Sequence, residues 1–137
     1  MWMKFRIFLI WLNVWLVVGH FGYMKTSKGI DDHNYQNFLS VLGDGNCWVK
    51  MTGPYRISHE QVPPYKDLLP FVTRLLDVAP ERLIWGSDWP HVMQVKPMPS
   101  DADLVDLFGA WVIQEALRKQ ILVDNPAKLY GFESINS

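Results

Sequence analysis

An acid and an imidazole follow a short apolar segment in the second half of the chain. Asp88 and His91 lie in the sequence Gly-Ser-Asp-Trp-Pro-His at 86–91, directly after the apolar residues 83–85. Carboxylates and imidazoles at the C-terminal ends of parallel strands activate water and transfer protons in many hydrolases. The segment therefore indicates hydrolytic chemistry, provided that other segments bring further groups to the same place.

Two earlier apolar segments also end in polar residues, and we expect each to be a strand. The strand expected at 14–18 is followed by His20, and the strand expected at 47–52 is followed by a loop that contains Arg56. The carboxyl ends of parallel strands lie at one edge of a sheet. His20 and Arg56 are therefore expected near Asp88.

Helical spacing of apolar residues separates these strands. The helices expected are 34–42, 65–78, 101–108, 111–121 and a short last helix from 125 that ends at Gly131. Asp32 and Ser100 are placed to cap the first and third helices, and Asn125 to cap the last, with Pro126 in its first turn. A strand–loop–helix unit recurs three times at roughly 35 residues, which is typical of parallel α/β architecture.

Composition, net charge and cysteine count limit what kind of protein this is. The chain has 137 residues, of which 49% are hydrophobic and 20% charged, so it is long and apolar enough for one folded domain. A net charge of −1 without a basic cluster argues against nucleic acid as a partner. Cys47, the single cysteine, excludes an internal disulfide, and we expect it to be a buried inert thiol rather than a nucleophile.

The N-terminus allows two interpretations. Lys4 and Arg6 precede an apolar stretch at 7–18, which has the length of a signal peptide but is short of the roughly 20 residues of a spanning helix. We favour an apolar extension at 1–13 leading into a buried strand of a cytoplasmic protein. The alternative is attachment to a membrane through residues 5–18.

Four segments together resemble one enzyme family. Residues 82–91 closely resemble the signature near the end of the amidohydrolase-related (amidohydrolase 2) family, and 43–58 resemble the preceding block. Residues 18–22 resemble its histidine strand, and 125–132 its closing helix. The match runs in unbroken order over about 14–132, and within the family it is most similar to the 2-pyrone-4,6-dicarboxylate lactonase-like group.

The resemblance implies the C-terminal part of a (β/α)8 TIM-type barrel of the metal-dependent-hydrolase kind, with about three β/α units. The three strands would be the sixth, seventh and eighth. The implied organisation is an extension at 1–13, a partial domain at 14–132 and a tail at 133–137. The family's His-x-His pair on its first strand has no counterpart here, and Gly19 replaces the usual aspartate beside His20.

The resemblance also implies roles for four residues. Asp88 would be the general base that takes a proton from the attacking water, and His20 would polarise the substrate carbonyl. Arg56 would anchor a substrate carboxylate with its guanidinium fork, and His91 would orient substrate or stabilise the oxyanion. The alternatives are structural: a turn acid, a buried histidine, a loop arginine and a surface turn residue.

A tightly held metal is not expected in this chain alone. Catalytic zinc needs about three protein ligands, and His20 with Asp88 supplies two. Metal-using members of the family hold a divalent ion such as zinc in the complete fold, whereas the lactonase group works without one. We therefore expect no cofactor.

The first hypothesis is a lactonase-like hydrolase that acts on a small cyclic ester of a carboxylic acid. The second is a truncated, non-catalytic piece that self-associates through open sheet edges or needs a complementing chain, because three β/α units cannot close an eight-stranded barrel. The third is a membrane-attached interaction protein. Whether the chain is an active enzyme unaided stays open from the sequence.

Overall fold

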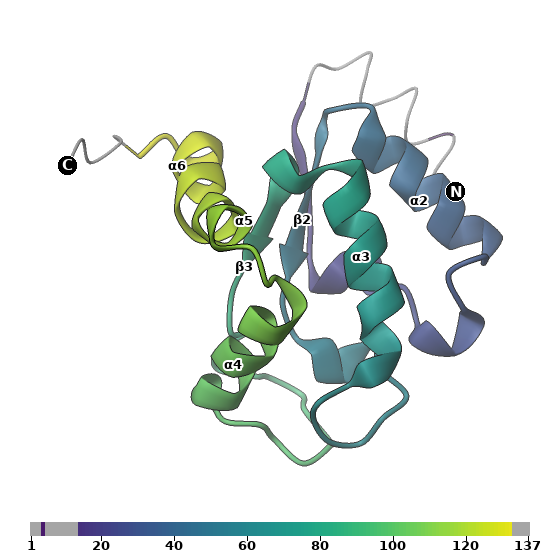
Figure 1. Ribbon diagram of the computed structural model, residues 1–137. Helices are drawn as coiled ribbons and strands as arrows, with labels where there is room; N and C mark the ends of the chain where they lie inside the picture. Colours follow the sequence, from purple (N-terminus) through teal and green to yellow (C-terminus); the bar gives the residue numbers. More distant parts are fainter. Residues whose placement is uncertain (1–3, 5–13, 133–137) are drawn as a thin grey trace.

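A three-stranded parallel sheet forms the centre of the molecule in the computed structural model, which describes residue 4 and residues 14–132 (Figure 1). The strands are β1 (Leu16–Val18), β2 (Cys47–Met51) and β3 (Leu83–Trp85), in the order β1-β2-β3. Val49 pairs with Val18 on one side and with Leu83 on the other. The three predicted strands are confirmed, with the first two shorter than expected. The first strand is not buried as expected, because Leu16 and Val18 are only half-buried and Val17 is 38% exposed.

Helices connect the strands and follow the last one. They are α2 (His33–Gly43), α3 (Leu69–Val78), α4 (Asp101–Trp111), α5 (Glu115–Lys119) and α6 (Asn125–Tyr130). Short 3-10 turns occupy several loops: His20–Tyr23, Thr26–Lys28, Pro54–Arg56, Lys66–Leu68 and Pro80–Arg82. The loops that leave the C-terminal ends of the strands gather with α4 at one end of the molecule (Figure 1). The site is built from these loops.

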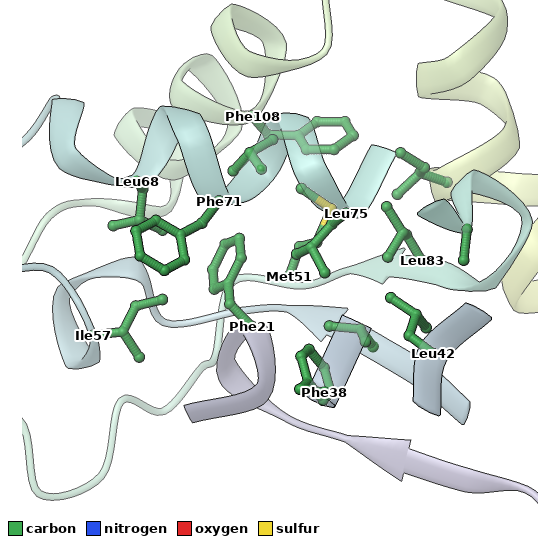
Figure 2. Close-up of a cluster of buried hydrophobic side chains, with 14 of the residues drawn as sticks. Phe21, Phe38, Leu42, Met51, Ile57, Leu68, Phe71, Leu75, Leu83 and Phe108 are labelled. Atoms are coloured by element: carbon green, nitrogen blue, oxygen red, sulfur yellow. The ribbon is translucent and has the colours of Figure 1, made fainter. Parts of the chain in front are cut away.

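The two faces of the sheet differ. Alternate residues of β2, Val49 and Met51, are 0% and 1% exposed and belong to the hydrophobic core, whereas Lys50 points to the opposite face and is half-buried. Figure 2 shows Leu75 of α3 beside Met51 in this core. Burying such a side chain contributes about 1.5–3 kcal/mol. This packing fixes β2, and hence the loop that follows it.

Two of the predicted helix caps are confirmed. Asp32 accepts hydrogen bonds from the backbone N–H groups of Asn34 and Tyr35 at the start of α2. Ser100 and Asp103 form a capping box, in which each side chain accepts from the other residue's backbone N–H. Asn125 is not a cap. It lies in a continuous helical run in which the π-helical turn Gln120–Asp124 joins α5 to α6.

The physical reason is where the Asn125 side chain points. Its Nδ2 donates to the carbonyl oxygens of Pro80 and Leu83, both at 2.7 Å, so it ties the last helix to the start of β3. The helix boundary expected near 108–111 is also wrong. α4 continues to Trp111, and the break comes at Val112, whose φ of −112° and ψ of 81° are not helical.

The predicted extension at 1–13 lies outside the described residues apart from Lys4, and so does the predicted tail at 133–137. Most of the segment proposed for membrane attachment, 5–18, is likewise outside them. Within residue 4 and residues 14–132, no helix has both the length and the apolar character needed to cross a membrane.

Candidate active site

Asp88 is the centre of a polar cluster at the C-terminal ends of the strands. Its Oδ2 accepts a hydrogen bond from Arg56 Nε at 2.7 Å and another from the Tyr55 hydroxyl at 2.7 Å. Its Oδ1 lies 3.8 Å from His20 Nδ1. The Asp88 side chain is only 16% exposed. One carboxylate oxygen is thus held by two donors while the other faces an imidazole.

His20 is fixed by Thr52, the first residue after β2. The His20 backbone N–H donates to Thr52 Oγ1 at 3.3 Å, and the ring Nδ1 lies 3.0 Å from Thr52 Oγ1 and 3.3 Å from the Thr52 carbonyl oxygen. The ring also meets Tyr23 edge to face, with centroids 4.8 Å apart. These contacts orient the imidazole toward Asp88.

A second imidazole reaches Asp88 only through Tyr55. The Tyr55 hydroxyl lies 2.8 Å from His91 Nδ1, and His91 Nε2 lies 3.2 Å from Asp101 Oδ1 at the start of α4. Arg56 is further held because its Nη2 donates to the Val92 carbonyl oxygen at 2.8 Å. The loops after β2 and β3 are therefore joined by several hydrogen bonds.

The backbone of these loops adopts conformations that bring the side chains close together. Gly53 has a φ of 57°, and a β-carbon there would lie 2.9 Å from both Asp88 Oδ2 and His20 Nδ1. Asp88 and His91 have φ values of 69° and 56°, and the His91 N–H donates to the Asp88 carbonyl oxygen at 2.7 Å. Left-handed conformations are uncommon outside glycine. The tight turn at 86–91 brings Asp88 and His91 together, and the absence of a side chain at Gly53 leaves space for the cluster.

The electrostatics of the cluster favour ionised Asp88. Burial alone would raise the pKa of the Asp88 carboxyl, but the hydrogen bonds from Arg56 and Tyr55 and the charge of His20 outweigh burial and lower it. Burial and the hydrogen bond to Asp88 together raise the pKa of the Tyr55 hydroxyl. Asp88 is thus a carboxylate, and Tyr55 a neutral hydroxyl, at neutral pH.

All four residues singled out from the sequence lie in this cluster: His20, Arg56, Asp88 and His91. Their chemical roles stay predictions. The sequence reasoning missed Tyr55 and Thr52. Tyr55 precedes Arg56 in the loop after β2, and an aromatic hydroxyl in a loop at that edge was the signal that could have identified it.

Residues 10–132 of the chain match the family model described as amidohydrolase. The chain belongs to the amidohydrolase family. It is 41% identical over 122 residues to a 4-sulfomuconolactone hydrolase of Hydrogenophaga intermedia, a match that covers 88% of this chain and 40% of that protein. The chain spans about two fifths of the length of the curated relatives it matches.

Solved structures agree with the predicted fold. A probable 2-pyrone-4,6-dicarboxylic acid hydrolase of Acinetobacter baumannii, with citric acid bound, matches with a TM-score of 0.77 and 32% identity, over 93% of this chain and 48% of that one. The three parallel strands with their helices correspond to part of the TIM barrel of such amidohydrolases. The partial-barrel prediction is confirmed.

A metal is known in one structural relative. An amidohydrolase of Burkholderia multivorans with bound zinc matches with a TM-score of 0.70 and 20% identity, over 96% of this chain and 49% of that one. Among residue 4 and residues 14–132, no group of three histidine, cysteine or acidic side chains is placed to hold a metal ion. His20 and Asp88 offer two ligands, and Arg56 already occupies one oxygen of Asp88. The described donors do not by themselves fit a zinc site.

Proposed function

We propose that this amidohydrolase hydrolyses a small lactone that carries an acid group, with Asp88 as the general base. The observation that carries the proposal is that the two oxygens of the Asp88 carboxylate have different partners. Oδ2 is held by Arg56 and Tyr55 at 2.7 Å, while Oδ1, 3.8 Å from His20 Nδ1, has no such donor among the described residues. An ionised oxygen beside an imidazole can take a proton from water.

His20 supplies the second function. Its Nδ1 faces Thr52 and Asp88, so the other ring nitrogen is left for substrate. In the doubly protonated ring, Nε2 donates a hydrogen bond to the lactone carbonyl oxygen and stabilises the charge that develops there as water attacks. Thr52 keeps the ring in that orientation.

Arg56 supplies the anchor for the substrate acid. Its Nε is engaged by Asp88 and its Nη2 by the Val92 carbonyl, and no described residue accepts from its Nη1. Nη1 therefore binds a substrate carboxylate or sulfonate and places the ring of the lactone over Asp88. Both ring nitrogens of His91 face groups of the chain, namely the Tyr55 hydroxyl and the Asp101 carboxylate. The predicted contact between His91 and substrate is therefore not needed for this proposal and stays a prediction.

The relatives support this substrate class. Their names include a 4-sulfomuconolactone hydrolase and a 2-pyrone-4,6-dicarboxylate hydrolase, each acting on a cyclic ester with acid substituents. The chain spans about two fifths of the length of such proteins, so catalysis by these residues unaided is itself part of the proposal. A cytoplasmic location is proposed as well.

The test is hydrolysis of 4-sulfomuconolactone and of 2-pyrone-4,6-dicarboxylate by the purified full chain. We expect hydrolysis by the wild type and a loss of about 100-fold or more in Asp88→Asn. Asp77→Asn is the matched control, because Asp77 is an exposed aspartate on α3. Absence of hydrolysis above background in the folded wild type would refute the proposal for this chain.

The alternative of self-association has a structural basis of its own. Among the described residues, β1 and β3 each pair only with β2, so each presents one unpaired edge. Size-exclusion chromatography with light scattering over a range of concentrations tests it. A single monomeric species at all concentrations would exclude this alternative.

A further inference from the structure

Four side chains form a continuous hydrogen-bonded row from the site to the surface. Tyr55 Oη lies 2.7 Å from Asp88 Oδ2 and 2.8 Å from His91 Nδ1. His91 Nε2 lies 3.2 Å from Asp101 Oδ1, and the Asp101 side chain is 55% exposed whereas that of His91 is 14% exposed. Asp88 is therefore connected to a surface carboxylate through a phenol and an imidazole.

The Tyr55 hydroxyl in this row has two possible acceptors but only one proton. A tyrosine hydroxyl has one proton to donate, so Tyr55 can donate to Asp88 or to His91 but not fully to both. If Tyr55 donates to Asp88, His91 Nδ1 must carry a hydrogen and donate to Tyr55. If His91 Nδ1 carries no hydrogen, that nitrogen becomes an acceptor and competes with Asp88 for the Tyr55 proton.

We propose that His91 is a positioning residue whose ionisation decides whether Tyr55 donates its proton to Asp88 or to His91. As an explanation of catalysis this rests on the proposed role of Asp88 as the base. The hydrogen-bond switch itself involves no substrate and stands on the geometry of the row.

The direction of the switch follows from Asp101. In the imidazolium, Nδ1 donates to Tyr55, Nε2 donates to Asp101, and Tyr55 donates to Asp88, so every group in the row is satisfied. When the ring loses one proton, the Asp101 carboxylate retains the hydrogen on Nε2 because it is an acceptor only. Nδ1 then accepts from Tyr55, and Asp88 loses one of the hydrogen bonds that stabilise its charge.

Loss of that hydrogen bond makes Asp88 a stronger base, because a bond to the charged form of a carboxyl favours the charged form. Three other charged groups lie near the row. Arg56 stays on Asp88 through Nε in both states, Asp103, in the first turn of α4, is engaged by Ser100, and His20 Nδ1 lies 3.8 Å from the other oxygen of Asp88, Oδ1. The hydrogen-bonded route from His91 to Asp88 Oδ2 therefore runs through Tyr55.

The experiment is NMR on the full chain without substrate. The 15N signals of His91, assigned by their loss in His91→Gln, and the 13C carboxyl signal of Asp88 are followed across pH in the wild type and in Tyr55→Phe. We expect the neutral ring of His91 to carry its hydrogen on Nε2. We also expect the Asp88 carboxyl signal to show a second inflection at the His91 midpoint, lost in Tyr55→Phe and in His91→Gln.

Two controls separate the switch from a general structural effect. His33→Gln should leave the second inflection of Asp88 unchanged, because His33 contacts Asn37 on the surface of α2. Asp101→Asn should weaken the preference for hydrogen on Nε2 and reduce the inflection. A wild-type Asp88 signal without an inflection at the His91 midpoint, or a neutral His91 with its hydrogen on Nδ1, would overturn the proposal. A failure of hydrolysis would instead count only against the proposed function.

Discussion

A β-carbon on Gly53 would lie 2.9 Å from Asp88 Oδ2. The same atom would lie 2.9 Å from His20 Nδ1 and 3.0 Å from the Cδ of Arg56. Side chains from three different strand ends therefore converge over the backbone of one glycine. Its φ of 57° adds a second reason for glycine at this position.

Gly53→Ala should consequently harm both stability and the site. The left-handed backbone costs an alanine about 1–2 kcal/mol, and the contacts with Asp88 and His20 require those side chains to move. We expect the free energy of unfolding in urea to fall by about 2 kcal/mol or more. Gly109→Ala is the control, since a β-carbon at Gly109 in α4 meets nothing within 4 Å and should raise stability by up to about 1 kcal/mol. Equal effects of the two variants would contradict this explanation.

The pairing of Arg56 with Asp88 predicts a pH dependence. The pKa of Asp88 is below its ordinary value, so ionised Asp88 contributes stability above its unfolded-state pKa, near 4, and this contribution is lost as pH falls through the lower folded-state pKa. Arg56→Gln removes the Nε donor and should raise the pKa of Asp88. We expect a loss of about 1–2 kcal/mol at pH 7, shrinking below about pH 4.

Urea unfolding of the wild type and Arg56→Gln at several pH values between 3 and 8 measures this difference. Lys119→Gln is the control, because Lys119 pairs with Asp124 on the surface and both side chains are more than half exposed. Such an exposed pair contributes at most about 0.5 kcal/mol. A difference for Arg56→Gln that stays constant over the whole pH range would show that Asp88 is not the partner that matters.

The strands, two helix caps and the convergence of the site residues could be predicted from the sequence. The strand at 83–85 and the caps at Asp32 and Ser100 were predicted because they depend on local patterns, namely an apolar run and side-chain acceptors at helix starts. The convergence of His20, Arg56 and Asp88 was predicted because parallel strands place their carboxyl ends at one edge of the sheet.

Features that depend on tertiary contacts were not predicted. Tyr55 reaches Asp88 across 33 positions of sequence, and no local pattern specifies which loop side chain bridges Asp88 and His91. Asn125 looked like a helix cap from its neighbour Pro126. Its amide instead donates to backbone carbonyls at 80 and 83, which only the packing of the last helix against β3 brings within reach.

A second carboxylate, Asp67, stabilises the loop that follows Arg56. Asp67 accepts hydrogen bonds from Ser58 Oγ at 2.6 Å, from the backbone N–H of His59 at 2.9 Å and from Thr26 Oγ1. Asp67→Asn places an amide N–H₂ among these donors and should cost about 2 kcal/mol. Unfolding in urea measures the loss, and Asp77→Asn, at an exposed position on α3, should change stability by less than about 0.5 kcal/mol. Similar losses in both variants would show that the network around Asp67 is not stabilising.

Cys47 should be unreactive in the folded chain. It is 0% exposed in the core, and burial raises the pKa of its thiol to about 12. The thiolate is the reactive form, so its scarcity alone slows reaction with Ellman's reagent by about 1,000-fold or more relative to a free cysteine. We expect almost no reaction in native buffer and complete reaction of this single thiol in guanidinium chloride. Asp77→Cys is the positive control, because it adds an exposed thiol that should react at the rate of a free cysteine. Rapid reaction of Cys47 in the native wild type would mean that the face of the sheet bearing Cys47 opens readily, in conflict with the core packing between β2 and its covering helices.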